Sequence, residues 1–186
     1  SDRDQQVSTL TKIAGLYEDR LSDMPRAITT WKRILELQPE HLPTMRNLAR
    51  LYERTQAWRE ILALNDAEAQ LSNDTNAVVS LAHRNAEILE DQLKDRPAAI
   101  TAWERVLKLS PNYLPALRAL GRLYLQDQRW SSLIDMYRAE SELASSTDQA
   151  ASLIMKIGEL AESRLNDGPR AISAYREVLT LAPAHT

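Results

Sequence analysis

The sequence predicts an all-α fold, a solenoid of about five helical hairpins, from an internal repeat and from composition. Residues 25–39 read PRAITTWKRILELQP, residues 97–111 read PAAITAWERVLKLSP, and residues 169–183 read PRAISAYREVLTLAP. Trp103 follows Trp31 by 72 positions, and roughly 40% of positions are identical between residues 1–72 and 73–144. The chain is rich in Ala, Leu, Glu and Arg and has only 4 glycines in 186 residues, which favours helix. A repeat at fixed spacing indicates one unit built several times rather than a single catalytic core.

The first half of the unit predicts two helices. Over residues 5–21, apolar side chains recur at spacings of three and four, the pattern of one helix face. They are Leu10, Ile13, Ala14, Leu16, Tyr17 and Leu21. Asp23 is a good N-cap, and Pro25 is tolerated in a first helical turn, so a second helix begins here and ends at Pro39. Its apolar face consists of Ala27, Ile28, Trp31, Ile34 and Leu35.

The second half of the unit predicts two more helices. One runs over about 42–55, with Pro43 in its first turn and an apolar stripe of Met45, Leu48, Ala49 and Tyr52. The other runs over about 58–71 and contributes Trp58, Ile61, Leu62 and Ala69. Repetition of this pattern gives a single solenoid over residues 1–186, with hairpins at about 5–38, 41–72, 75–110, 113–144 and 147–182.

These hairpins resemble tetratricopeptide repeats. Residues 120–124, LGRLY, are similar to the family's L-G-x-x-Y motif, and residues 48–52 and 13–17 are variants of it. Ala27, Trp31 and Pro39 match the family's alanine, aromatic and proline positions, whereas Leu89 and Ala161 replace the motif tyrosine. The 72-residue double repeat is similar to bacterial-type arrays. The resemblance implies a right-handed superhelix whose first helices line a concave wall, the usual binding surface.

Two packing predictions follow from the repeat. A small residue occupies one site in every first helix, where we expect helix backbones to approach closely; these residues are Ala14, Ala49, Ala86, Gly121 and Gly158. The aromatic residues are expected to fill the gaps between hairpins. We therefore predict that Trp31 and Trp103 are buried between neighbouring repeats.

The main candidate for a binding site is a stripe of arginines. Arg46, Arg50 and Arg54 lie four residues apart on one predicted helix, and Arg118 and Arg122 copy the first two. Like charges at this spacing oppose helix formation by about 0.2–0.5 kcal/mol per pair, which suggests an anionic partner such as an acidic peptide. The predicted partner-binding residues of the concave groove are Arg46, Asn47, Arg50, Arg54, His83, Arg84, Arg118 and Arg122, with Lys12 and Lys156 extending the patch.

A structural reading of the same arginines remains open. Equivalent positions on neighbouring first helices would place Arg50 near Glu87, Arg54 near Asp91 and Arg122 near Glu159. Such pairs would form lateral salt bridges between repeats. Both readings can hold together, because an exposed ion pair contributes under ~1 kcal/mol and yields easily to a ligand.

The predicted function is protein–protein recognition, as a scaffold or adaptor that binds a partner peptide or protein in the concave groove. One alternative is self-assembly, with exposed apolar terminal hairpins stacking end to end. Another is docking of a globular signalling protein such as a small GTPase. The net charge of −3 gives no global case for nucleic acid, and the repeat-periodic aromatic residues favour core packing over base stacking. We expect no cofactor and a cytoplasmic location.

Catalysis is not predicted. The three histidines, His41, His83 and His185, form no pair four residues apart, and the sequence contains no cysteine. Phosphate-cradling loops and nucleophile elbows are also missing from the sequence. No apolar run approaches the ~18 residues that span a bilayer. Residues 183–186, PAHT, match the start of residues 39–43, so we expect a piece of a longer array.

Overall fold

The computed structural model describes residues 2–181, and this part of the chain is helical without a strand. A short π-helical segment, η1 (Ile88–Gln92), continues α5. The α-helices of the described residues are α1 (Asp2–Asp19), α2 (Met24–Leu37), α3 (Leu42–Arg54), α4 (Trp58–Leu71), α5 (Thr75–Glu87), α6 (Arg96–Leu109), α7 (Leu114–Gln126), α8 (Trp130–Glu142), α9 (Thr147–Ser163) and α10 (Gly168–Leu181). The predicted all-α class is confirmed.

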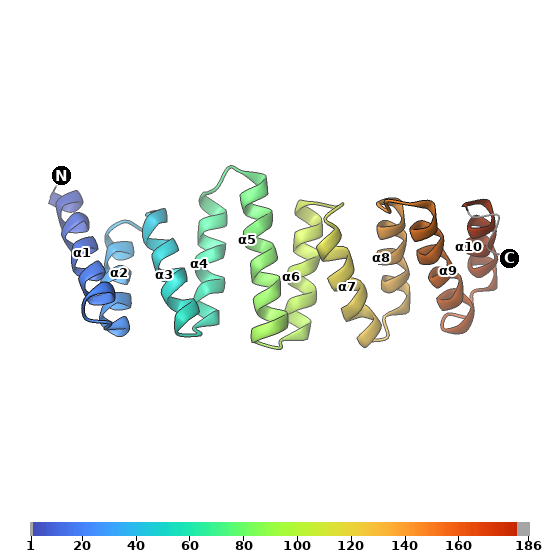
Figure 1. Ribbon diagram of the computed structural model, residues 1–186, viewed down its shortest axis with the longest axis horizontal. Helices are drawn as coiled ribbons and strands as arrows, with labels where there is room; N and C mark the ends of the chain where they lie inside the picture. Colours follow the sequence, from blue (N-terminus) through green and yellow to red (C-terminus); the bar gives the residue numbers. More distant parts are fainter. Residues whose placement is uncertain (1, 182–186) are drawn as a thin grey trace. The chain divides into compact units, whose positions relative to one another are not determined.

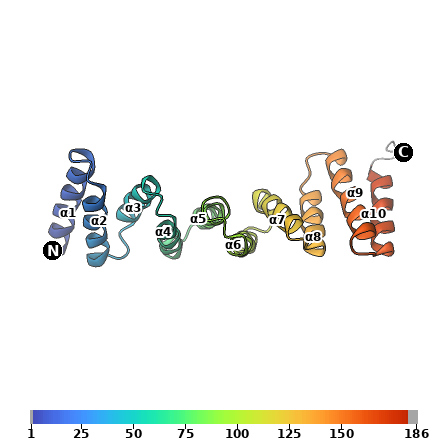
Figure 2. The same cartoon turned by 90° about the horizontal axis from the view of Figure 1, so that it is seen from below.

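The chain divides into two compact units, Ser1–Lys94 and Asp95–Thr186. In each unit, every α-helix packs against the one that follows it in the chain (Figures 1 and 2). The α1–α2, α3–α4, α7–α8 and α9–α10 pairs are the hairpins that the repeat predicts. The boundary between the units lies between the two helices of the expected hairpin 75–110. That hairpin, the single solenoid and its right-handed winding stay predictions.

The turns inside the hairpins repeat the same local chemistry. Asp23, Asp95 and Asp167 each accept a hydrogen bond from the backbone N–H three residues later, at 3.0, 3.2 and 3.0 Å. The predicted N-cap role of Asp23 is therefore confirmed. One residue in each of five turns has a left-handed φ between 52° and 57°: Ser22, Gln56, Lys94, Gln128 and Asn166.

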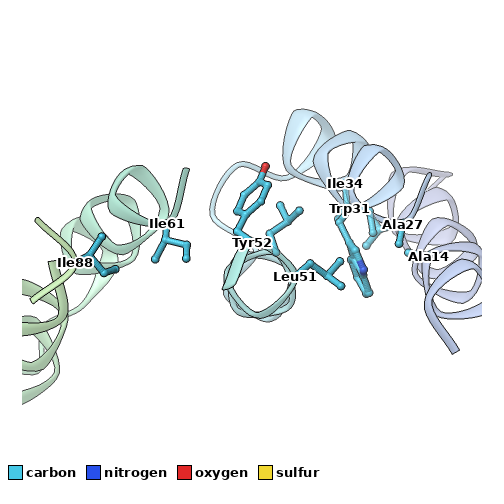
Figure 3. Close-up of a cluster of buried hydrophobic side chains, with 10 residues drawn as sticks. Ala14, Ala27, Trp31, Ile34, Leu51, Tyr52, Ile61 and Ile88 are labelled. Atoms are coloured by element: carbon cyan, nitrogen blue, oxygen red, sulfur yellow. The ribbon is translucent and has the colours of Figure 1, made fainter. Parts of the chain in front are cut away.

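The core of the first unit lies between successive hairpins. Trp31 is 5% exposed, and Figure 3 shows its indole between Leu51 of α3 and Ala14 of α1. Ile34, Leu48 and Ile61 belong to the same cluster and are almost completely buried. The predicted stripes of α2, α3 and α4 are all buried or half-buried. The burial of Trp31 between neighbouring hairpins is confirmed.

The second unit has a comparable core. Its α8, α9 and α10 share a cluster in which Ile134, Ile157 and Val178 are buried. Trp103 of α6 is 3% exposed, so its predicted burial is also confirmed.

The small residues of the first helices are buried, but the reason differs from the prediction. A Cβ built on Gly158 would stand 2.4 Å from the Tyr175 ring, so a side chain rather than a helix backbone approaches this site. At Gly121 the nearest atoms, from Leu133 and Met136, are 3.8 and 3.9 Å away, so an alanine would fit there. Close backbone approach is therefore not the requirement at either glycine.

The predicted stripe of the first helix is only partly correct. Ala14 is buried, and Leu10 and Tyr17 pack against the core. Ile13, Leu16 and Leu21 are instead 39%, 55% and 64% exposed. Pro183, His185, the segment 183–186 and the last residue of the expected hairpin 147–182 lie outside the described residues.

Candidate functional site

The arginines of α3 lie on the face opposite its buried side chains. One face of α3 packs into the core through the buried side chains of Met45, Leu48 and Leu51. Arg46, Arg50 and Arg54 stay exposed, one turn apart. The helix pattern that buries the leucines therefore also aligns the arginines. Each of them makes an ion pair within the molecule.

Glu18 of α1 is the acceptor for two of these arginines. Arg50 donates from Nη1 to Oε1 and, at 2.9 Å, from Nη2 to Oε2 of Glu18, and Arg54 Nη1 lies 3.5 Å from Oε1. The Glu18 side chain is only 7% exposed, whereas that of Arg50 is 50% exposed. A buried carboxylate needs such partners, because an unpaired buried charge is costly. The hydrogen bond to Glu18 in turn raises the pKa of Arg50 above its ordinary value.

A second ion pair joins the next two first helices. Arg84 of α5 donates through Nη2 to Glu53 of α3. We call the set Glu18, Arg50, Arg54, Glu53 and Arg84 the first-helix ladder; it links α1 to α3 and α3 to α5 in the first unit. Lateral salt bridges between repeats are therefore present.

The partners predicted for two of these arginines were wrong. Arg50 and Arg54 both pair with Glu18 on the preceding first helix, not with Glu87 and Asp91 on the following one. Glu87 lies 3.1 Å from Nε2 of His83, one turn away on its own helix. Both arginines point towards the preceding first helix, where Glu18, near the end of α1, offers a buried carboxylate.

Two further arginines pair with the second helix of their own hairpin. Arg46 donates from Nε to Glu68 at 2.9 Å, and Arg118 donates from Nε to Glu140 at 2.7 Å. Each residue of the second pair follows its counterpart by 72 positions, so the repeat preserves the interaction. The arginines are 69% and 53% exposed and the carboxylates 16% and 13%.

The remaining predicted residues lie in varied surroundings. Asn47 is half-buried on α3, and Arg122 is exposed on α7. Lys12 is exposed on α1, whereas Lys156 on α9 places Nζ 5.6 Å from the centre of the Tyr137 ring. In the first unit the structure thus brings Arg50, Arg54 and Arg84 into one ladder and directs Arg46 towards α4.

The pairs of Arg46, Arg50, Arg54 and Arg118 present a guanidinium to solvent and hold the carboxylate underneath. In the Arg84–Glu53 pair the carboxylate is instead the more exposed member, at 47% against 37%. Each arginine is oriented by a fixed acceptor and keeps donor capacity, since a guanidinium carries five N–H groups. A planar donor of this kind suits an incoming carboxylate. The surface can therefore bind an anionic group without displacing its own buried glutamates.

The three cavities described below lie away from the predicted arginines. Open cavities of about 530, 360 and 430 Å³ lie at α1–α2, at the α2–α3 turn and at α9–α10, and none is lined by the six predicted arginines. Among the described residues, no three metal-binding side chains gather in one place. None of the described helices combines the length and apolar character that a membrane crossing requires.

The aromatic residues take part mainly in packing. Tyr52 and Tyr124 are buried like Trp31 and Trp103, as the periodicity indicates. Tyr124 donates to Glu104 at 2.7 Å, and burial together with this bond raises the pKa of Tyr124 to about 12. At the equivalent site of the first unit, Lys32 Nζ lies 5.8 Å from the Tyr52 ring centre.

The acidic partners of the arginines and a buried amide pair were not predicted from the sequence. Glu18, Glu68 and Glu140 were not singled out, although glutamate recurs at positions 18, 90 and 162 and at 68 and 140. That recurrence was the available signal. Asn65 of α4 donates to Asn85 of α5 at 2.7 Å within the core of the first unit. Neither asparagine recurs in the repeat, so periodicity could not find them.

Comparison with known proteins shows similarity to one family of helical repeats. The model of the tetratricopeptide repeat family matches residues 116–151, which cover most of α7, all of α8 and the start of α9. Superkiller protein 3 of Schizosaccharomyces pombe is 25% identical over 134 residues, 69% of this chain and 10% of that protein. The chain thus spans about a tenth of the length of this curated relative.

Solved structures with similar folds belong to the same class. A tetratricopeptide repeat protein from Parabacteroides merdae has a TM-score of 0.53 at 17% identity, covering 97% of this chain and 68% of that one. The crystal structure of YrrB, described as a TPR protein with an unusual peptide-binding site, has a TM-score of 0.50 at 14% identity, covering 95% and 86%. At such identities the likeness concerns the fold alone.

Proposed function

We propose that this chain, which is similar to tetratricopeptide repeat proteins, captures an acidic segment of a protein partner on the arginines of its first helices. The fold supports a protein–protein interaction scaffold in general, because stacked hairpins create extended binding surfaces. The proposal adds a chemistry of recognition and the residues that provide it: Arg46, Arg50, Arg54 and Arg84 in the first unit and Arg118 and Arg122 in the second.

The observation behind the proposal is the unequal burial within the ion pairs. If the pairs served stability alone, either partner could be the exposed one. In the pairs of Arg46, Arg50 and Arg118, the carboxylate is the more buried member and the guanidinium faces solvent. The exposed group is thus held in place before a ligand arrives, which lowers the ordering entropy lost on binding.

The spacing of the arginines indicates the form of the ligand. Residues four apart on a helix are separated by about 6 Å along its axis. Alternate side chains of an extended chain on one face are separated by about 6.6–6.8 Å. An extended segment with Asp or Glu at every second position therefore matches Arg46, Arg50 and Arg54 in register.

The test is a titration of a labelled, extended peptide with acidic residues at alternate positions, followed by fluorescence anisotropy. We expect binding that weakens as salt rises, because exposed charges are screened. One double variant is tested for each unit: Arg46→Gln/Arg50→Gln in the first and Arg118→Gln/Arg122→Gln in the second. The variant in the unit that binds the peptide is expected to weaken binding at least tenfold. The matched control is Arg59→Gln/Arg176→Gln, which removes two exposed arginines from the second helices α4 and α10.

The outcomes separate the alternatives. Binding that survives both arginine double variants contradicts the proposal. Equal loss in the control variant would indicate a general effect of net charge rather than a site. Retention of a folded protein bait by variants that no longer bind the peptide would favour docking of a globular partner elsewhere on the hairpins.

A further inference from the structure

A large apolar side chain is exposed in the interior of the chain. Leu125, on α7, is 48% exposed. Other exposed apolar residues lie on the first or the last helix: Ile13 and Leu16 on α1, Ile172 and Leu179 on α10. Helix α7 instead has α6 before it and α8 and α9 after it in the same unit, and Leu125 is exposed in their presence. A single exposed leucine is common, so its surroundings decide what it can do.

Leu125 shares a helix face with the arginines of the second unit. Arg118, Arg122 and Leu125 follow one another at spacings of four and three residues, which place them on the same side of α7. All three are exposed, whereas Leu120 and Leu123, which point elsewhere, are buried. The exposed stripe of α7 is therefore cationic at two positions and apolar at the next one.

The repeat shows that this apolar residue replaces a charge. Leu125 follows Glu53 by 72 positions, and Lys156 follows Arg84 by 72 positions. In the first unit Glu53 and Arg84 form the ion pair between α3 and α5, and the Glu53 side chain is 47% exposed. In the second unit Lys156 Nζ instead lies 5.6 Å from the centre of the Tyr137 ring. The second unit thus presents an apolar side chain where the first presents a carboxylate.

This replacement changes which ligands the two units suit. An exposed carboxylate such as Glu53 repels an incoming acidic group. Leu125 removes that repulsion, and covering it stabilises a complex because apolar surface leaves water. The second unit therefore suits a ligand that carries both carboxylates and an apolar side chain.

We propose that the second unit binds an extended segment with two acidic residues and, at the next alternate position, a large apolar residue that covers Leu125. The inference rests on the proposed function, because Arg118 and Arg122 hold the two carboxylates. Leu125 lies three residues beyond Arg122, about 4.5 Å along the helix axis. Alternate side chains of an extended chain are about 6.6–6.8 Å apart, and the length of the arginine side chain accommodates the difference.

The test compares three labelled peptides with blocked ends by fluorescence anisotropy. Their sequences are Asp-Ser-Asp-Ser-Leu, the reverse order Leu-Ser-Asp-Ser-Asp, and Asp-Ser-Asp-Ser-Ser. Both orders are needed because an extended chain can run along α7 in either direction. We expect one leucine peptide to bind roughly tenfold more tightly than the serine peptide, the gain from covering about half of a leucine. This ratio should persist as salt rises, although every affinity falls, because salt screens charges and not apolar contacts.

Substitutions assign the preference to one side chain. Leu125→Ser is expected to remove the preference and to leave binding of the serine peptide unchanged, whereas Leu125→Met should retain the preference. Leu179→Ser is the matched control, because Leu179 is similarly exposed on α10, and this variant should keep the preference. Circular dichroism checks that each variant is folded.

The outcomes separate this inference from the proposed function. Equal affinities for the leucine and serine peptides, or a preference that survives Leu125→Ser, overturn the inference and leave the acidic site in place. An equal loss of preference in Leu179→Ser also overturns it. Binding that requires Arg46 and Arg50 rather than Arg118 and Arg122 supports the proposed function and overturns the inference. Failure of every acidic peptide to bind overturns both.

Discussion

The ring of Tyr175 lies over Gly158 so closely that a Cβ on this glycine would stand 2.4 Å from Cε1. The two residues occupy the positions of Trp31 and Ala14, two repeat lengths earlier in the chain. Trp31 and Ala14 share the core cluster of the first unit (Figure 3). In both hairpins an aromatic residue of the second helix thus meets a small residue of the first.

Gly158→Ala is expected to destabilise the chain by roughly 1 kcal/mol. The new methyl group forces the Tyr175 ring aside, which costs about 1–3 kcal/mol, and better helix propensity returns up to about 1 kcal/mol. Urea unfolding measures the difference. Gly121→Ala is the matched control and should stabilise, because its nearest neighbours are 3.8 Å away or more. Equal effects at the two glycines would refute the contact with Tyr175.

Trp31→Ala is expected to cost about 3–5 kcal/mol in unfolding free energy, since it empties the space between two hairpins. Trp31→Phe should cost much less. Nε1 of Trp31 is buried without a hydrogen-bond partner among the described residues, so losing the indole N–H breaks no such bond. Thermal denaturation followed by circular dichroism distinguishes the variants. An unchanged midpoint for Trp31→Ala would mean that the indole is not a core element.

Gln56→Gly and Gln128→Gly are each expected to stabilise the chain by about 0.5–1 kcal/mol. Both glutamines have left-handed φ angles, 57° and 54°, where a side chain is strained and glycine is not. Each follows a first helix whose end is closed by a hydrogen bond typical of a Schellman motif, from Ala57 N–H to Tyr52 O at 2.8 Å and from Arg129 N–H to Tyr124 O at 2.9 Å. Arg33→Gly, at an exposed position inside α2, should instead destabilise by about 1 kcal/mol. A lower unfolding midpoint for Gln56→Gly would contradict the assigned backbone.

Stability is expected to fall between pH 10 and about 12 because of Tyr124. Its pKa is raised from 10.0 to about 12 in the folded chain, by burial first and by the bond to Glu104 second. The unfolded chain therefore loses the phenolic proton earlier as pH rises, and unfolding becomes easier. Below pH 10 the contribution of Tyr124 is complete. Tyr124→Phe should flatten this part of the stability profile, measured by urea unfolding at each pH. A slope identical to that of the unmodified chain would exclude Tyr124 as its source.

The bond between Glu18 and Arg50 is expected to show a coupling of about 1 kcal/mol in a double-mutant cycle. Glu18→Gln, Arg50→Gln and the double variant provide the three comparisons. The half-exposed arginine limits the value, and the buried carboxylate keeps it above that of a typical surface pair. The coupling should decrease only modestly in high salt. A coupling of zero would remove Glu18 as the anchor of the ladder.

The sequence was sufficient for the helices because their ends and faces are local. The Asp23 cap, Pro25 and Pro39 delimit α2, and the spacing of Leu48 and Tyr52 defines the buried side of α3. The repeat then gave the surroundings of Trp31. It did not show which residues of the α1 stripe are buried, and Leu16 is 55% exposed.

The ion pairs were harder to predict because they depend on side-chain direction between helices. The spacing placed Arg50 on the correct face of α3, but it did not identify the partner of Arg50, since the neighbouring first helices on both sides carry glutamates. The choice of Glu18 depends on the local enclosure of that carboxylate, which periodicity does not encode. The Asn65–Asn85 pair departs from the apolar repeat and was therefore invisible to it.

The most direct test of the recognition surface exchanges the members of one ion pair. Arg46→Glu combined with Glu68→Arg keeps opposite charges together but changes the group that faces solvent from a guanidinium to a carboxylate. We predict a nearly unchanged unfolding midpoint and loss of binding to the acidic peptide, measured by fluorescence anisotropy. Peptide binding with undiminished affinity, in a folded variant, would contradict the claim that the outward-facing arginine recognises the partner.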